Sequence, residues 1–212
     1  MSYIQSFYKS RTRFIVENIK MQGNELDILD IGCVGEGNTI HNKIIKRTKD
    51  DFKSFTGMDI DPAIKLLTPE LNVTYENFSI YALKDNAKYE KKFDVIILAE
   101  VIEHLQDTFM AINSLKYVLK DNGVILMTYP NPFSLSPLIR FFMTNDPLSE
   151  KQLRSFCGCP EHIFIPALPV FYKYLRSMDL IVKTVGYIKP RFSMLSFFHK
   201  FAPTLGLVIY KK

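Results

Sequence analysis

The chain has 212 residues and a net charge of +5, with 47% hydrophobic and 23% charged residues. This length suits one domain, and the balanced composition excludes a disordered, collagen-like, coiled-coil or integral membrane class for the whole chain. No apolar run approaches the roughly 20 residues that span a bilayer, and we see no secretory signal at the N-terminus. The chain has three cysteines, of which only Cys157 and Cys159 are close together. This pattern favours a cytoplasmic protein over a disulfide framework.

The charge is distributed unevenly along the chain. Residues 1–132 hold 16 Lys and Arg against 18 Asp and Glu, whereas residues 133–212 hold 11 against 4. The second segment also contains half of the aromatic residues. A basic, aromatic-rich final third fits an anionic substrate, peripheral contact with a membrane, or nucleic acid. A solvated basic face over an aromatic core explains it equally well.

The predicted elements alternate between helix and strand after an amphipathic helix over residues 3–20. Their order is strand 26–31, a glycine-rich turn, helix 38–49, strand 52–60, a short helix from Asp61-Pro62, strand 73–76, strand 93–98, helix 106–119, a turn at Asn122-Gly123 and strand 124–129. This alternation indicates a parallel sheet with right-handed crossovers, which is an α/β doubly wound domain.

The pattern breaks after Pro132. Residues 133–167 contain four prolines and alternate poorly, so we interpret them as a helical lid or substrate insertion over the carboxyl edge of the sheet. A helix over 168–178 and strands over 180–187 and 205–211 follow, and the two strands look like an antiparallel pair. We therefore expect one domain over residues 1–212. Its parts are an N-terminal helix (1–24), a cofactor-binding core (25–132), the lid (133–167) and a C-terminal helix and hairpin (168–212).

The glycine-rich turn is the first candidate for a binding site. Gly32 and Gly35 follow the strand that carries Asp30, and glycines let a backbone turn sharply and approach a ligand. Glu36 inside this turn disfavours a bound pyrophosphate. Asp59 ends the next strand, where a carboxylate can grip ribose hydroxyls. An ordinary turn with capping acids is the simpler alternative.

Five motifs make the predicted function more specific, and together they cover residues 25–130. They are Asp30-Ile31-Gly32-Cys33, Gly57-Met58-Asp59-Ile60-Asp61, Phe93-Asp94-Val95-Ile96, Glu100-Val101-Ile102-Glu103-His104-Leu105 and Leu119-Lys120-Asp121-Asn122-Gly123. Their order and spacing resemble those of class I S-adenosylmethionine-dependent methyltransferases, and the set is similar to the branch of ubiquinone-biosynthesis O-methyltransferases.

The resemblance implies a Rossmann-like sheet of seven strands with a final antiparallel hairpin, and S-adenosylmethionine as the cofactor. It also implies cofactor contacts, with Asp30, Gly32 and Gly35 around the methionine moiety, Asp59 on the ribose, Ile60 against adenine and Glu100 near the methionine end. Cys33, next to Gly32, is a further candidate for cofactor binding.

Two positions depart from the family pattern. The usual loop reads Asp-x-Gly-x-Gly-x-Gly, whereas the later glycines here are Gly35 and Gly37, so the loop must bend differently. The acidic residue expected after the third strand is missing. Asn77, followed by Phe78, stands nearest to that position, and an amide can still hydrogen-bond adenine.

The Glu-x-x-Glu-His cluster is the second candidate site. If a helix begins at Glu100, then Glu103 and His104 share its face, and His162 can supply a fourth ligand for Mg²⁺ or another divalent metal. This set looks like that of the small-RNA 3′-terminal 2′-O-methyltransferases, where it holds a metal against the substrate hydroxyls. The alternative is that Glu100 serves the cofactor, Glu103 caps the helix and His104 packs or acts as a base.

We therefore expect a methyltransferase that acts on a small-molecule or lipid-linked acceptor, at oxygen rather than nitrogen. A hydroxyl nucleophile would use His104, His162 or a metal, because these groups accept its proton or lower its pKa. Two alternatives to this interpretation stay open. One is a metal-assisted RNA 2′-O-methyltransferase, and the other is a non-catalytic binding protein on a methyltransferase scaffold.

Overall fold

The computed structural model describes residues 3–34, 39–134, 139, 162–188 and 201–212. In these ranges eight strands form one sheet, in the order β1-β7-β8-β6-β5-β2-β3-β4. Only β8 is antiparallel to its neighbours. The strands are β1 (Ile4–Tyr8), β2 (Leu26–Ile31), β3 (Phe52–Asp59), β4 (Val73–Asn77), β5 (Phe93–Ala99), β6 (Leu119–Pro130), β7 (Leu180–Ile188) and β8 (Thr204–Lys211).

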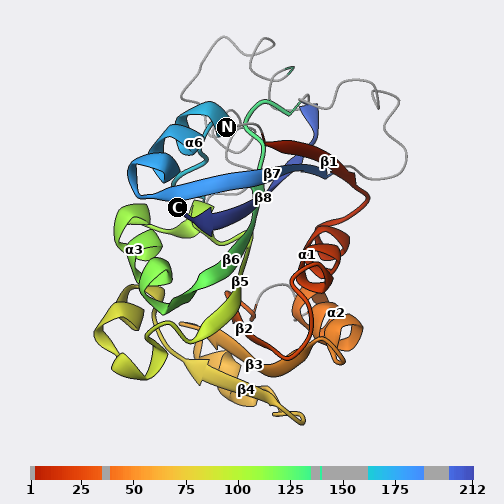
Figure 1. Ribbon diagram of the computed structural model, residues 1–212, viewed down its shortest axis with the longest axis vertical. Helices are drawn as coiled ribbons and strands as arrows, with labels where there is room; N and C mark the ends of the chain where they lie inside the picture. Colours follow the sequence, from red (N-terminus) through yellow and green to blue (C-terminus); the bar gives the residue numbers. More distant parts are fainter. Residues whose placement is uncertain (1–2, 35–38, 135–138, 140–161, 189–200) are drawn as a thin grey trace.

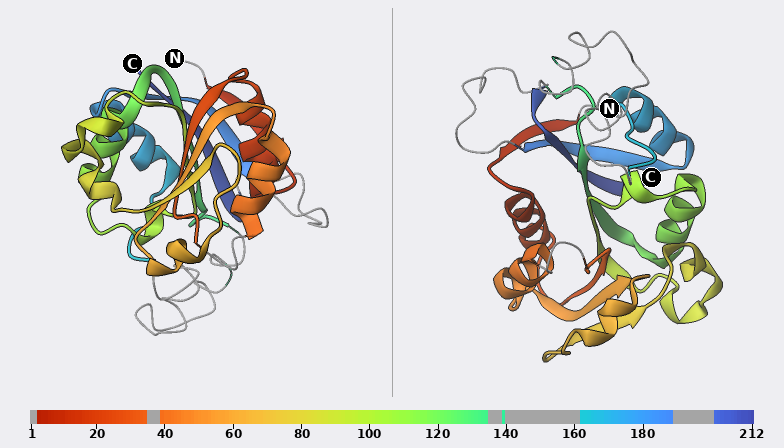
Figure 2. Two further views of the ribbon diagram at one scale, coloured as in Figure 1. Left: turned by 90° about the horizontal axis from the view of Figure 1, so that it is seen from below. Right: turned by 180° about the vertical axis from the view of Figure 1, so that it is seen from behind.

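Helices cover both faces of this sheet, as the views in Figure 1 and Figure 2 show. The α-helices are α1 (Arg11–Lys20), α2 (Thr39–Thr48), α3 (Thr108–Val118) and α6 (Leu168–Ser177). In the part of the chain that the structure describes, four short 3₁₀ helices lie between strands, namely η2 (Pro62–Leu66), η3 (Ile80–Asp85), η4 (Ala87–Tyr89) and η5 (Ile102–His104). The α/β architecture and the antiparallel pair β7–β8 confirm the predicted fold. None of the helices in the described ranges is long and apolar enough to cross a bilayer.

The apolar run of β5 explains the two hydrophobic cores. Successive strand residues point to opposite faces of a sheet. Val95 and Ile97 pack with α1 and α2 on one face, and Ile96 and Leu98 pack with α3 and α6 on the other. All four side chains are completely buried, as expected for a parallel strand covered by helices on both sides.

The predicted helix over residues 3–20 is confirmed only in its second part. Residues 4–8 form the edge strand β1, which pairs in parallel with Thr184–Ile188 of β7 and gives the sheet eight strands instead of seven. Ser10 then begins α1, because its side chain accepts a hydrogen bond from Arg13 N at 3.2 Å. The Phe7 ring stacks on Tyr187 at 5.9 Å. This pairing with a distant strand outweighs the helical spacing of the apolar residues.

The predicted turn at Asn122-Gly123 lies inside β6, which begins at Leu119 instead of Val124. The register between β5 and β6 shifts at this point, so the extra residues of β6 form a local irregularity within the strand. A Cβ atom on Gly123 would lie 2.6 Å from Leu119 Cδ1 and 3.0 Å from the Asp94 carbonyl oxygen. Glycine is therefore required by a close approach rather than by a hairpin.

The strand order locates the crevice in which a ligand would bind. The chain proceeds from β2 to β3 and β4 on one side, and from β5 to β6 on the other. The carboxyl ends of β2 and β5 are therefore the topological switch point, where open α/β sheets bind ligands. Of the predicted lid, residues 135–138 and 140–161 lie outside the described ranges, and residues 162–167 have no regular structure before α6. The lid stays a prediction.

Candidate active site

The glycine turn brings the loops after β2 and β5 into contact. Gly32 has a φ of 77°, which favours glycine, and its N–H donates to the Met58 carbonyl oxygen at 2.9 Å. A Cβ atom at this position would lie only 2.5 Å from Val101 Cγ2. Gly32 is therefore required both by its backbone conformation and by the loop after β5. Gly35 lies outside the described residues.

Asp59 joins the loops that follow β2 and β3. Its Oδ2 accepts a hydrogen bond from Val34 N, and its Oδ1 accepts one from Asp61 N, both at 2.9 Å. Its backbone oxygen accepts from Asn77 Nδ2 at 2.9 Å and from Phe78 N at 3.0 Å, which adds the loop after β4. A carboxylate bound by backbone amides is held in one orientation, so Asp59 presents a fixed negative charge at the sheet edge.

Three further residues from the predicted cofactor set lie around this edge. Ile60 is 72% exposed, directly after β3. Phe78 is half-buried and packs against the core, with its ring 5.9 Å from that of Tyr89. Cys33 is buried, and burial strongly raises the pKa of its thiol, which therefore stays protonated at neutral pH. An apolar surface at Ile60 can contact a ligand, whereas Cys33 can contribute only its backbone.

Asp30 lies at the end of β2, and its carboxylate contacts a buried histidine. Asp30 Oδ2 is 2.6 Å from His41 Nδ1, and the two side chains are only 5% and 2% exposed. The other ring nitrogen of His41 lies 3.2 Å from the hydroxyl of Tyr75 on β4. The sequence analysis did not identify His41, because its neighbours in the chain form no motif that marks it.

Glu100 follows β5 in an unusual conformation. Its φ is 60°, and its N–H donates to the Thr128 carbonyl oxygen at 3.0 Å. Its carboxylate lies 3.4 Å from Arg11 Nη1, at the start of α1. Arg11 was also missed from the sequence, since nothing in its local pattern indicates that the end of β1 and the end of β5 share one edge of the sheet.

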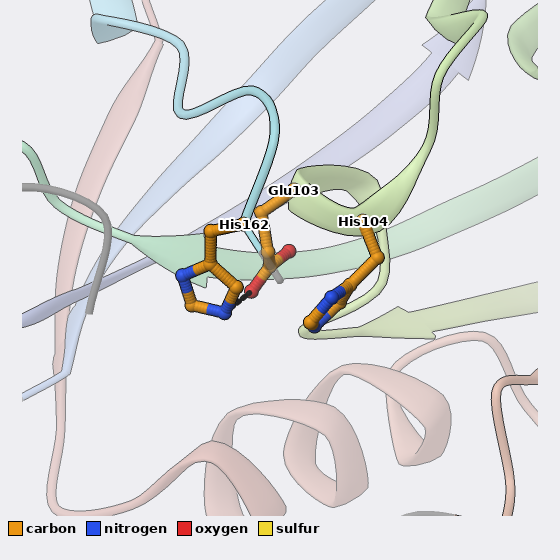
Figure 3. Close-up of side chains that lie close together, drawn as sticks. All are labelled: Glu103, His104 and His162. Carbon is orange, nitrogen blue, oxygen red and sulfur yellow. Dashed lines mark ion pairs between the residues drawn. The ribbon is translucent and has the colours of Figure 1, made fainter. Parts of the chain in front are cut away.

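The Glu-x-x-Glu-His segment does not form the helix face that the spacing suggested. Only Ile102–His104 are helical, as the single 3₁₀ turn η5, and Glu100 lies outside it. Glu103, His104 and His162 do come together, with one ligand atom from each within 4.8 Å of the others (Figure 3). Three of the four predicted metal ligands therefore cluster, while the Glu100 carboxylate pairs with Arg11.

The geometry of this cluster is set by Glu103. Its side chain is completely buried, and His162 Nε2 lies 3.9 Å from its Oε1. The His104 and His162 rings lie 4.7 Å apart, nearly edge to face at 76°. The Glu103 backbone oxygen accepts hydrogen bonds from Ile163 N at 2.7 Å and Phe164 N at 3.1 Å. These bonds hold the chain segment that carries His162 against η5.

The Glu103 carboxyl holds its proton more strongly than an ordinary glutamate does. Burial, followed by the negative charge of Glu100, raises its pKa from 4.5 to about 8. Neither of its oxygens accepts a hydrogen bond from another described residue. A protonated carboxyl can donate to an imidazole or to a ligand oxygen, and it can ionise when a cation binds.

The family of the chain follows from a comparison with known domains. A family model described as "Methyltransferase domain" matches residues 2–184. The chain belongs to this family. This methyltransferase is 30% identical over 127 residues to a ubiquinone biosynthesis O-methyltransferase of Histophilus somni, and 29% identical over 125 residues to one of Rickettsia bellii. These matches cover 55% and 57% of this chain, and 51% and 50% of the relatives, so the chain spans about half the length of the curated relatives it matches.

Solved structures share the fold at low sequence identity. A methyltransferase from Archaeoglobus fulgidus, described as S-adenosylmethionine-dependent, superposes with a TM-score of 0.61 at 20% identity and covers 96% of this chain and 95% of its own. The plantazolicin methyltransferase BpumL, solved in complex with S-adenosylhomocysteine, gives 0.63 at 18% identity, covering 95% and 82%. The predicted membership of the class I methyltransferases is confirmed, while the roles assigned to individual site residues stay predictions.

Proposed function

We propose that this chain transfers a methyl group from S-adenosylmethionine to a hydroxyl of a small-molecule or lipid-linked acceptor. One observation carries the proposal. The glycine turn, the fixed Asp59 carboxylate and the Arg11–Glu100 pair all lie at the carboxyl edge of the sheet, around its switch point. The Glu103–His104–His162 cluster follows the same strand end.

The charges at this edge suit the parts of S-adenosylmethionine. Asp59 offers a carboxylate to the ribose hydroxyls, and the exposed Ile60 offers an apolar surface to adenine. The Arg11 guanidinium and the Glu100 carboxylate match the carboxylate and the ammonium group of the methionine part. When bound, the cofactor supplies an electrophilic methyl group on a sulfonium, and the protein has to orient and deprotonate the acceptor.

The histidine pair suits a hydroxyl acceptor. An imidazole with an unperturbed pKa of about 6.5 can accept a proton at neutral pH. His104 is exposed at the end of η5, where it can reach an acceptor, and His162 lies edge-on against it, next to Glu103. We assign His104 as the general base and His162 as its neighbour in the acceptor site. The names of the curated relatives support transfer to oxygen.

Replacing His104 tests this assignment. We expect His104→Ala to lower kcat by about 100-fold or more, because positioned general bases typically contribute about 10²–10⁴-fold. The measurement is transfer of labelled methyl groups to a simple phenol and to a phenol with a short isoprenoid chain. The affinity for S-adenosylhomocysteine should not change.

Gln106→Ala is the matched control, because Gln106 is an exposed neighbour outside the cluster. Wild-type turnover in a folded His104→Ala protein would disprove the base assignment. Transfer to a short RNA but to neither phenol would favour the RNA reading. Binding of S-adenosylhomocysteine without transfer to any acceptor would favour a non-catalytic scaffold.

The same cluster favours a second candidate, which is metal-assisted methyl transfer. Ligand distances of about 2.0–2.2 Å around Mg²⁺ or Zn²⁺ place ligand atoms about 3–4 Å apart. The ligand atoms of Glu103, His104 and His162 lie within 4.8 Å of one another, so small side-chain rotations would let them fit one ion. Such an ion would lower the pKa of the acceptor hydroxyl.

Metal removal separates the two candidates. Metal assistance predicts that EDTA abolishes transfer and that Mg²⁺, Mn²⁺ or Zn²⁺ restores it. It also predicts a metal-binding isotherm that disappears in Glu103→Gln and persists in Gln106→Ala. Full activity in EDTA would exclude this candidate and leave the metal-free base.

A further inference from the structure

His41 occupies a position that the proposed reaction does not use. It lies in the first turn of α2, its side chain is almost completely buried, and both ring nitrogens face polar partners. Burying an imidazole and a carboxylate costs free energy unless they are hydrogen-bonded, so Asp30 and His41 depend on each other at this position.

The Asp30–His41 pair joins the two ends of the glycine turn. Asp30 is the penultimate residue of β2, and His41 is the third residue of α2, so the whole turn lies between them. Their side chains meet at 2.6 Å. Asp30 lies two residues before Gly32, so this contact ties α2 to the end of β2 from which the turn begins.

His41 also contacts two aromatic residues of neighbouring strands. Its Nε2 lies 3.2 Å from the Tyr75 hydroxyl, and the rings of Phe55 on β3 and Tyr75 on β4 each lie 5.5 Å from the imidazole. A neutral ring with its proton on Nδ1 donates to Asp30 and accepts from Tyr75, and an imidazolium donates to both. Both partners are therefore satisfied in either state of the ring.

The part of the turn nearest to this contact also carries the cofactor groups. Gly32 follows Asp30 by two residues, and its N–H donates a hydrogen bond to the Met58 carbonyl oxygen. Val34 N donates to the Asp59 carboxylate. A movement of Asp30 would therefore shift Gly32 and the amide that orients Asp59. Without His41, the buried Asp30 carboxylate would lose this hydrogen-bond partner, and an unpaired buried carboxylate is unfavourable.

We propose that His41 is a positioning residue for the cofactor. It fixes the base of the glycine turn through Asp30 and thereby sets the affinity for S-adenosylmethionine without touching it. This inference rests on the proposed function for its ligand. It adds to the sequence-based expectation for Asp30, since Asp30 would also transmit the effect of His41 to the turn.

Binding and hydrogen exchange of the full chain test the inference. His41→Gln should weaken S-adenosylhomocysteine binding by about tenfold or more, because losing a buried charge-assisted hydrogen bond costs about that much. Tyr75→Phe should have a smaller effect of the same sign. Without any ligand, the Gly32 and Val34 amides should exchange faster in His41→Gln than in the wild type. The KM for the acceptor should stay unchanged.

A double-mutant cycle and a control distinguish positioning from general destabilisation. The loss in Asp30→Asn/His41→Gln should be clearly smaller than the sum of the two single losses, because both act through one contact. Thr48→Val is the control, since Thr48 is buried in the same helix and its hydroxyl bonds only the Ile44 carbonyl among the described residues. It should lower Tm without changing ligand affinity or exchange at Gly32.

Each outcome decides a different question. If the wild type binds no S-adenosylhomocysteine, the proposed function fails, and the exchange data still report whether His41 holds the turn. Wild-type affinity or wild-type exchange in folded His41→Gln and Tyr75→Phe proteins would overturn the inference, as would strictly additive losses in the cycle.

Discussion

Asp59→Ala is expected to raise the Kd for S-adenosylhomocysteine by about 100-fold or more, because charge-assisted hydrogen bonds are each worth about 1.5–3 kcal/mol. The variant loses the carboxylate proposed to bind the ribose. It also loses the two hydrogen bonds that this carboxylate accepts from Val34 N and Asp61 N. Calorimetric titration of the purified chain measures the change.

The matched variants separate ribose binding from loop support. Asp59→Asn keeps one oxygen acceptor for the loops and should lose less affinity than alanine. Asp61→Ala removes the carboxylate that caps η2 through Ala63 N, two residues away, and should leave the affinity near that of the wild type. If Asp59→Ala binds as tightly as the wild type, the assignment of Asp59 to the cofactor is wrong.

Glu103→Gln is expected to change how the stability of the protein depends on pH. The pKa of Glu103 is raised to about 8 in the folded state, whereas the unfolded value is near 4.5. Between these values the folded state keeps a proton that the unfolded state releases, so the contribution of this group to stability falls as pH rises through this window. A glutamine cannot ionise. The variant should therefore gain stability relative to the wild type by on the order of a few kcal/mol between pH 5 and pH 9.

Urea unfolding at pH 5, 7 and 9, in the presence of EDTA, measures this difference. Glu70→Gln is the control, because Glu70 is exposed after η2, and its difference from the wild type should stay small and constant over this range. Equal pH dependence of Glu103→Gln and the wild type would mean that the Glu103 carboxyl is not held neutral by the fold.

Local chemistry was enough to predict most of the helices and strands over residues 25–130. The β5 run is predicted as a strand buried on both faces because all its side chains except that of Asp94 are apolar. The Asp61-Pro62 start of η2 follows from capping and a fixed proline φ. These signals act over a few residues, so they are visible without the fold. The first residues of the chain are different. Ile4–Tyr8 become a strand only because β7, nearly 180 residues later, offers an edge for pairing.

The sequence by itself determined the family and the residues that follow each strand, because the motifs at Gly32, Asp59 and Glu103 are local and ordered. The tertiary structure alone decided which of them meet. It separated Glu100 from the Glu103 cluster by pairing it with Arg11, and it placed His41 on Asp30. Charged side chains at the ends of distant strands pair with one another because burying an unpaired charge costs free energy. No local sequence pattern predicts which strand ends become neighbours.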